Sequence, residues 1–515
     1  MWRYDPTSKE STGVIAGSRP GPEVSSDTTE LPLDIRAALE SLVQRILSGD
    51  ELVAPYFTSS QPLIAARAPG RLDVMGGIAD YSGSTVLQLP LKESTVMFCQ
   101  YHHTPEFRLV SQAIDGDADA QVFCMPMSDF FDGKSGLACS EVHMHHYFNS
   151  LGDESRWAAY VAGVITVLMV HTDCDISTKR GLQLHVSSTV PPGKGVSSSA
   201  ALEVATMRAL CCLLELTLSA HEQALLCQRV ENHIVGAPCG LMDQMASSCG
   251  QQGALMRMLC QPDIVEEPVL LPDGLSLWGI DSGIRHAVTG ADYSSVRIAA
   301  FMGYRYLLEL AGIAGKEIAA ADIVDTLWQG YLANVSMFEF VQSLEAQLPE
   351  QLSGLDFLQH FDDTTDAITV VDPDAIYAVR VCTAHPIEEH FRARLFIQLA
   401  NAAHSNIDQE SLAKLMGECM YQSHASYSRC KLNSDGTDDL VARLKSCDHD
   451  SGIYGARITG GGSGGVVAVL ARSDSHSLIH SIASQYAASW GVGGHVFSGS
   501  SAGAEGYHLV PATIV

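Results

Sequence analysis

The distribution of apolar and polar residues along the chain predicts a mixture of helices and strands. Helical spacing of apolar residues predicts a helix at Leu33–Leu47, and a nearly continuous apolar stretch predicts a buried helix at Trp157–His171. In GLQLHVSSTV, leucine and valine alternate with polar residues, so Gly181–Val190 is expected to be a strand. Further strands are expected at Leu63–Arg67, Val86–Gln100, Leu255–Leu259 and Leu275–Ile280, and further helices at Val296–Leu310, over much of Glu388–Ala403, and after Ser411.

In one segment the apolar residues show no regular spacing. His102–Ser150 is polar and irregular, and we interpret it as an insertion that contains some strands. Its histidine-rich stretch HMHHYF, His143–Phe148, could suggest a metal site, but no acidic or cysteine partner lies at a suitable spacing. We therefore expect a solvated loop there.

Two glycine-rich loops interrupt the predicted elements. Pro191–Ala201, PPGKGVSSSAA, follows a strand and leads into a long helix whose start is marked by serines. Thr459–Gly465 lies between two strand-like runs, so it does not fit the dinucleotide fingerprint, in which a helix follows the glycines. Taken alone, this second loop could simply be the turn of a hairpin.

Composition and charge narrow the class of protein. The 515 residues are 46% hydrophobic and 17% charged, which is typical of a globular protein with a large core. The formal net charge of −28 argues against nucleic acid or an anionic membrane as a partner, because both are polyanions. The apolar stretch Tyr160–Val170 is shorter than the roughly 20 residues that span a bilayer.

The cysteines and the N-terminus indicate a cytoplasmic protein. The 14 cysteines include no C-x-x-C pair, which favours free thiols in a reducing compartment. The first 31 residues lack the apolar run of a signal peptide and are rich in Ser, Thr, Pro and Gly, so we expect a disordered tail at 1–31.

The first glycine loop has the chemistry of an anion site. Free N–H groups at a helix start and the positive end of the helix dipole favour an anion, and Lys194 adds a positive charge. Serine hydroxyls can cap the helix or bind Mg²⁺. The loop has no Walker A sequence, and from this motif alone an ordinary capped helix explains it about as well.

Three acidic residues stand out in largely apolar or glycine-rich surroundings. Glu231 and Asp243 flank the stretch NHIVGAPCGLM, which is largely apolar, and a carboxylate there is costly unless it is paired, hydrogen-bonded or metal-bound. They could also cap helices or meet arginines. In GGIADYSGS, Asp80 could hold a polar ligand, whereas Gly77 and Ile78 offer a ligand no polar side chain.

Five stretches occur together in an order that resembles one family. They are ARAPGRLDVMGGIADYSG, VPPGKGVSSSAALEVA, ENHIVGAPCGLMDQ, DSGIRHAVTGADYSSVR and YGARITGGGSGG. From about Ile64 to the C-terminus, the chain resembles the galactokinase branch of the GHMP small-molecule kinases. The resemblance implies an α/β (α+β) two-domain GHMP kinase fold with ATP and sugar at the domain junction. We place the N-terminal domain at 32–250 and the C-terminal domain at 251–515.

The resemblance also implies roles for individual residues, with ATP and Mg²⁺ as cofactors. It implies that Asp243 lies beside the anomeric hydroxyl of the sugar, that Arg71 stabilises charge near the transferred phosphoryl group, and that Ser198 and Glu231 bind Mg²⁺. Trp157 and Tyr160 match aromatics near adenine, although plain helix core is nearly as good an interpretation. The implied phosphate-binding residues are Pro192, Gly193, Lys194, Gly195, Val196, Ser197, Ser198, Ser199 and Ala200. The implied sugar-binding residues are Gly77, Ile78, Asp80, Gly240 and Tyr293.

One departure from the galactokinase pattern points to the substrate. Galactokinases read G-E-H-x-D-Y at the sugar loop, and the Glu and His face the C6 hydroxyl, whereas this chain has Gly77 and Ile78 at those places. GGIADYSG, GKGVSSSAA and GIDSGIRH resemble the plant-type L-arabinokinase branch, of which this chain resembles the kinase half alone. L-Arabinopyranose is D-galactopyranose without its C6 hydroxymethyl group.

The resemblance thus implies a sugar 1-kinase that makes β-L-arabinose 1-phosphate and ADP. A galactokinase with an altered C6 pocket, and a non-catalytic regulator that binds sugar and ATP on the same fold, remain alternatives.

Overall fold

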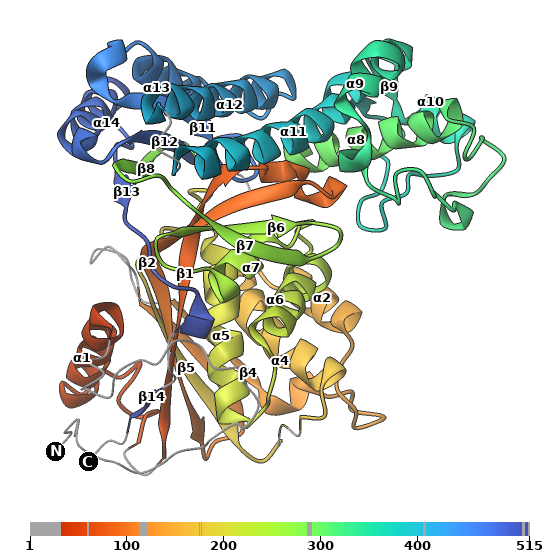
Figure 1. Ribbon diagram of the computed structural model, residues 1–515. Helices are drawn as coiled ribbons and strands as arrows, with labels where there is room; N and C mark the ends of the chain where they lie inside the picture. Colours follow the sequence, from red (N-terminus) through yellow and green to blue (C-terminus); the bar gives the residue numbers. More distant parts are fainter. Residues whose placement is uncertain are drawn as a thin grey trace.

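The computed structural model describes residues 32–512, except for residues 59–60, 113–120, 175, 177, 286–290, 405–407 and 507–509. The tail expected at 1–31 lies outside the described residues. The chain forms two stacked parts: the lower is built on a large sheet, and the upper on a small sheet and several long helices (Figure 1).

The lower part contains an eight-stranded mixed sheet. Its main order is β14-β1-β2-β5-β3-β4, β6 also pairs with β2, and β7 pairs with β6. All pairs are antiparallel except β3 with β5. The strands are β1 Leu63–Met75, β2 Thr85–His102, β3 Glu106–Gln112, β4 Gln121–Pro126, β5 Gly181–Ser188, β6 Ala254–Leu259, β7 Ile264–Leu270 and β14 Val510–Ala512. The division at residue 250 stays a prediction, and the pairing of β6 with β2 carries the lower sheet on to Leu270.

Strand β1 is longer than its pattern predicts. It continues past Arg67 through Pro69 to Met75, and its register against β2 shifts on both sides of Arg71. A proline removes one ladder hydrogen bond, which an irregularity of this kind accommodates. Every residue of β1 is buried. The strand runs up the lower part and ends where the two parts meet (Figure 1).

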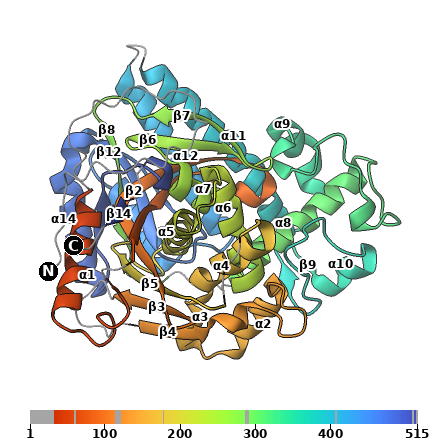
Figure 2. The same cartoon turned by 90° about the horizontal axis from the view of Figure 1, so that it is seen from below.

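Helices cover both faces of the large sheet. The helix α5, Ser198–Leu213, packs on β1 and β2 and is seen end-on among α4, α6 and α7 in Figure 2. Helix α1, Leu33–Leu47, covers the opposite face, packing Ile35 and Leu42 against Phe98, and its bounds match the prediction. The other helices of this part are α2 Glu141–Ser150, α3 Asp153–Arg156, α4 Ala159–His171, α6 Ala220–Arg229 and α7 Met242–Cys249.

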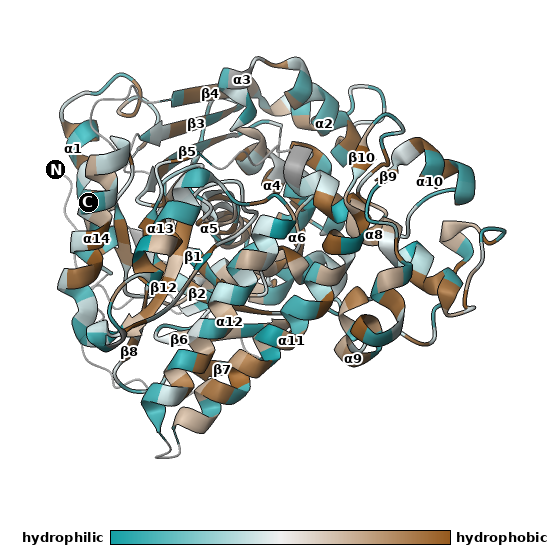
Figure 3. Cartoon of the chain, turned by 90° about the horizontal axis from the view of Figure 1, so that it is seen from above, coloured by the Kyte–Doolittle hydropathy of each residue, from teal (hydrophilic) through white to brown (hydrophobic). Residues whose placement is uncertain are grey.

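The upper part is a four-stranded antiparallel sheet covered by helices. Its order is β11-β12-β8-β13, and α11 and α12 run side by side along it (Figure 3). The strands are β8 Leu275–Asp281, β11 Ile453–Ile458, β12 Val466–Arg472 and β13 Val496–Ser498. The helices are α11 Val379–Ala403, α12 Gln409–Arg429, α13 Asp435–Lys445 and α14 His476–Trp490. Thr459–Gly465 joins β11 to β12, which confirms that this loop is the turn of a hairpin.

A lobe projects from one side of the upper part (Figure 1). It contains α8 Ala291–Leu310, α9 Met337–Glu339, α10 Gly354–His360, β9 Leu352–Ser353 and β10 Ile376–Tyr377. Short 3-10 or π-helical turns in the described part of the chain are η1 Gly77–Ser82, η2 Met127–Phe130, η3 Val230–Val235, η4 Ala320–Asp322, η5 Leu332–Asn334, η6 Phe340–Leu344, η7 Glu345–Gln347, η8 His449–Ser451, η9 Ser473–Ser475 and η10 Ala504–Gly506. Within the described part of the chain, no helix combines the length and apolar character needed to cross a membrane.

The expectation of a solvated loop at His143–Phe148 is wrong. These residues belong to α2, whose N-cap Ser140 accepts a hydrogen bond from the backbone of His143. Met144 and Phe148, four residues apart, are buried against the main core, while the histidines between them hide this helical spacing in the sequence.

Candidate active site

A pocket opens where the two parts of the chain meet. The lower part contributes the end of β1, the start of α5, and the segment from Glu231 to Asp243, and the upper part contributes Tyr293 and Gly461. The pocket is lined by Arg71, Ile78, Asp80, Gly193, Gly195, Ser197, Ser198, Ser199, Glu231, Ala237, Pro238, Cys239, Gly240, Met242, Asp243, Tyr293 and Gly461. Three of the five sequence motifs contribute several residues to this common space, and the other two contribute one residue each, Tyr293 and Gly461.

The first glycine loop presents the start of α5 to this pocket. Gly193 and Gly195 have φ near 70°, and Ser197 at the N-cap has φ 59°, all in the left-handed region. Ser197 makes no side-chain cap hydrogen bond, and its buried Oγ has no partner among the described residues. The first N–H groups of α5 are thus left without a cap at the positive end of the helix dipole, which suits a phosphate group.

Arg71 links this loop to Asp243. Its Nε and Nη2 lie 2.9 and 2.7 Å from Oδ1 of Asp243, and its Nη1 donates to the carbonyl of Gly195 at 2.7 Å. The backbone N–H of Arg71 also donates to the carbonyl of Val196 at 3.1 Å. The guanidinium is nearly fully buried, so its charge acts in a place where water screens it little. A cation held in this way can stabilise charge on a phosphoryl group and on an attacking oxygen.

Two further carboxyl groups, those of Glu231 and Glu203, lie near Asp243, and Glu231 lines the pocket with it. Gln244 Nε2 donates to Glu231 at 2.6 Å and to Glu203 at 3.2 Å, and both carboxyl groups are buried. Burial and the charge of Asp243 raise the pKa of Glu231 to about 7, and burial and Glu231 raise the pKa of Glu203 well above its usual value. A divalent cation near Glu231 would relieve this repulsion, and carboxylate and hydroxyl oxygens such as those of Glu231 and Ser198 are ligands that Mg²⁺ accepts. The residues present therefore fit the metal.

The loop that is expected to contact the sugar, Gly77–Ser82, is called the sugar loop and forms another wall of the pocket. Gly77–Ser82 is a turn of 3-10 helix, η1, in which Asp80 Oδ1 accepts the backbone N–H of Tyr81 at 2.7 Å. Burial and the charge of Asp243 raise the pKa of Asp80 to about 7. A Cβ at Gly240 would lie 1.8 Å from Asp80 Oδ2, so only glycine lets the chain pass this carboxyl group. Ile78 is 1% exposed and lines the pocket with an apolar side chain.

Comparison with known proteins shows the family of the chain. The family described as "GHMP kinases N terminal domain" matches residues 159–251, and that described as "GHMP kinases C terminal" matches residues 402–488. Over 492 residues the chain is 40% identical to an L-arabinokinase of Arabidopsis thaliana, covering 87% of this chain and 46% of that protein. The chain belongs to the GHMP kinases. It spans about half the length of that Arabidopsis relative.

Two galactokinases are also similar to this GHMP kinase. The galactokinase of Chloroflexus aggregans is 28% identical over 305 residues, covering 59% of this chain and 70% of that protein. The crystal structure of Lactococcus lactis galactokinase complexed with galactose superposes with a TM-score of 0.66 at 19% identity, covering 92% of this chain and all of that one. The two-domain GHMP kinase fold expected from the sequence is therefore confirmed.

The pocket of this GHMP kinase gathers most of the residues that the sequence singles out, but not all. Pro192, Lys194, Val196 and Ala200 belong to the phosphate loop without lining the pocket, and Lys194 Nζ instead pairs with Asp281 of β8 at 2.9 Å. Trp157 and Tyr160 do not line it either, and Trp157 packs against the main core. Gly77, which precedes Ile78, does not line the pocket. The ligand-binding roles of all these residues stay predictions.

Sequence reasoning missed Glu203 and Gln244, which hold Glu231 from behind. Glu203 lies in the apolar helix ALEVATMRAL, where a single acidic residue is an unusual signal. A buried carboxyl group on a helix that begins at a phosphate loop could have been identified from that signal.

Proposed function

We propose that this chain is an ATP- and Mg²⁺-dependent sugar 1-kinase that converts L-arabinose to β-L-arabinose 1-phosphate and ADP. One observation carries the proposal: Arg71 and Asp243 form an ion pair between a phosphate loop and a sugar loop, in one pocket with Ser198 and Glu231. The 40% identity to an L-arabinokinase and the apolar Ile78 in the sugar loop favour arabinose over other sugars.

Different residues of the pocket have different roles in the proposed phosphoryl transfer. Gly193, Gly195 and the N–H groups at the start of α5 hold the phosphates of ATP, and bound Mg²⁺ supplies countercharge beside Ser198 and Glu231. Asp243 Oδ1 accepts hydrogen bonds from Arg71, which leaves Oδ2 to orient the anomeric hydroxyl or accept its proton. Arg71 stabilises the charge that develops between the attacking oxygen and the phosphoryl group.

Two other functions make distinct predictions. A galactokinase with an altered C6 pocket would turn over D-galactose faster than L-arabinose. The 28% identity to the Chloroflexus aggregans galactokinase supports this alternative. A regulator on the same fold would bind sugar and ATP without releasing ADP.

The deciding experiment is sugar-dependent release of ADP, measured by a coupled assay with L-arabinose, D-galactose and other common pentoses and hexoses. We expect the highest kcat/KM with L-arabinose, and a product that carries phosphate on the anomeric oxygen by NMR. A higher kcat/KM with galactose would replace the proposal by the galactokinase, and ligand binding without ADP release would replace it by the regulator.

A further inference from the structure

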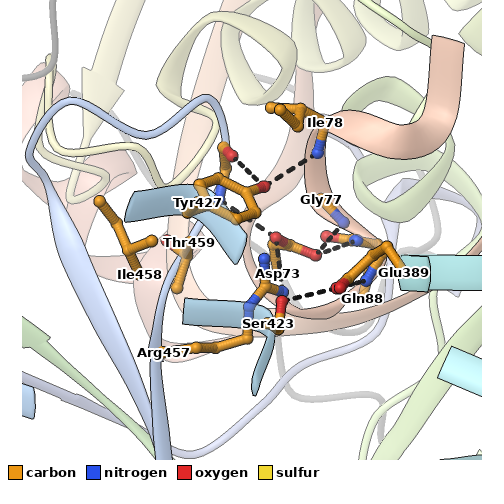
Figure 4. A network of polar contacts seen from close by, with 12 residues as sticks. Asp73, Gly77, Ile78, Gln88, Glu389, Ser423, Tyr427, Arg457, Ile458 and Thr459 are labelled. Carbon is orange, nitrogen blue, oxygen red and sulfur yellow. Dashed lines mark hydrogen bonds and ion pairs between the residues drawn. The ribbon is translucent and has the colours of Figure 1, made fainter. Parts of the chain in front are cut away.

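A buried tyrosine connects the sugar loop to the second glycine loop. Tyr427 of α12 accepts a hydrogen bond from the backbone N–H of Ile78 and donates one to the carbonyl of Gly460, both at 2.9 Å (Figure 4). Ile78 lines the pocket from the sugar loop, and Gly461, next to Gly460, lines it from the glycine loop. One hydroxyl group therefore fixes two walls of the pocket that belong to different parts of the chain.

The same hydroxyl group occupies the space of a side chain at position 77. A Cβ built on Gly77 would lie 1.9 Å from the hydroxyl oxygen of Tyr427, far inside van der Waals contact. It would also lie 2.9 Å from Nη2 of Arg457 and 3.0 Å from Oδ2 of Asp73. Gly77 has φ 47°, which adds a smaller cost for any other residue. Glycine is thus required at this position as long as the tyrosine is present.

The surroundings leave Tyr427 little room to move. Its ring meets His385 edge to face, with centroids 5.1 Å apart, and the guanidinium of Arg457 lies 5.1 Å from its ring centroid. Arg457 is in turn paired with Asp73 at 3.0 Å, and both side chains are fully buried. A rearrangement that makes space beside Gly77 would have to break this ion pair or expose the ring.

We propose that Tyr427 is a positioning residue that determines sugar specificity. Its hydroxyl group holds the backbone of Ile78, so that position 78 presents isoleucine to the sugar beside Asp80 of the same loop, and it fills the space that a side chain at position 77 would take. The inference rests on the proposed sugar kinase function and extends it. A sugar with hydrogen at the facing carbon fits such a wall, whereas a hydroxymethyl group there finds no hydrogen-bond partner from residues 77 and 78.

A double-mutant cycle tests the steric part of the inference. Gly77→Ala alone should lower kcat/KM for L-arabinose by about 100-fold, since a displacement of about 1 Å in a site can cost that much. Tyr427→Phe removes the oxygen that would meet the new methyl group, so Gly77→Ala in that background should cost less than about 10-fold. If the two substitutions act independently, their effects on kcat/KM multiply and their shifts of the midpoint of thermal unfolding add. That result would overturn the inference.

Tyr427→Phe alone tests the positioning part. The loss of two buried hydrogen bonds should raise KM for L-arabinose by about 5- to 10-fold and raise the galactose-to-arabinose ratio of kcat/KM, because Ile78 is no longer held. The matched control is Tyr377→Phe, which removes a buried hydroxyl that accepts the N–H of Asp372 at 3.0 Å in the side lobe. It should leave both quantities unchanged.

The outcomes separate this inference from the proposed function. If Tyr427→Phe and Tyr377→Phe leave KM and the sugar ratio equally unchanged, Tyr427 is structural only and the inference fails. If the wild-type chain phosphorylates no sugar, the proposed function fails. In that case sugar binding measured by calorimetry replaces KM in the same cycle, and independent effects there would still overturn the inference.

Discussion

Asp73 offers a test of how much the buried junction contributes to stability. Its carboxylate accepts four hydrogen bonds: Oδ2 from Arg457 at 3.0 Å and the N–H of Gly460 at 3.2 Å, and Oδ1 from Gln88 at 2.8 Å and the N–H of Gly77 at 3.2 Å. Figure 4 shows Gly77, Gln88 and Arg457 around this carboxylate. The substitution Asp73→Asn keeps the shape and changes only charge and hydrogen-bonding capacity.

The expected loss follows from the burial of both partners. An amide has a single acceptor oxygen, so in either orientation its NH₂ group faces two donors of the four. It also leaves Arg457, which is fully buried, without the charge of its paired carboxylate. Removal of one partner from a buried ion pair typically costs about 3–5 kcal/mol, so we expect the free energy of unfolding to fall by about that amount.

The chain supplies a control with the same chemistry. Arg472 and Asp474 form an ion pair of the same residue types at the same 3.0 Å, but their side chains are 46% and 74% exposed. Asp474→Asn should leave stability almost unchanged, because water screens an exposed pair. Urea unfolding followed by circular dichroism measures both variants, and equal losses of stability would refute the argument from burial.

Four further predictions concern the site. Asp243→Asn should lower kcat by about 10²–10⁴-fold with ATP binding by calorimetry nearly unchanged, and turnover within about threefold of wild type would remove Asp243 from the mechanism. Glu231→Gln should raise the Mg²⁺ concentration for half-maximal activity, because an amide is a poorer ligand for a hard cation, and titrations that overlay wild type would exclude this ligand. Gly240→Ala should raise KM for the sugar but not for ATP, because its Cβ would meet the carboxyl group of Asp80, whereas Gly152→Ala, with nothing within 4 Å, should change neither. The pKa of Asp80 is raised to about 7 from 3.8, so the folded state takes up a proton and gains stability as pH falls from about 7 toward 4. Asp80→Asn should therefore raise the midpoint of thermal unfolding more at pH 8 than at pH 5. An equal change at both pH values would contradict the raised pKa.

Local patterns were enough to predict most elements of the fold. The spacing of apolar residues predicted α1 to the residue, and the strand alternation of GLQLHV predicted β5 within two residues of its end. Both signals depend only on which side of a single element faces the core. The histidines of α2 mislead for the same reason, since its buried Met144 and Phe148 form too short a stripe to be recognised by spacing alone.

The motifs also predicted which residues belong to the site, because their chemistry is unusual wherever they lie. Three signals can be recognised without a structure. They are carboxylates in an apolar stretch, glycines before serines, and Gly77 and Ile78 where the galactokinase pattern has Glu and His. Their order along the chain indicated the family, which the comparisons confirm. The function of each residue at the site remains a prediction.

Only the tertiary structure explains why position 77 is glycine. The galactokinase pattern by itself suggests that Gly77→Glu with Ile78→His would add polar contacts to a C6 hydroxyl. The structure predicts instead that the change disrupts the loop, since the space beside Gly77 belongs to Tyr427, whose hydroxyl bonds Ile78 across 349 residues of sequence. The sequence by itself determined that this loop departs from the galactokinase pattern at positions 77 and 78. The reason for the difference is the volume and hydrogen bonding of a distant side chain, which only folding brings to that place.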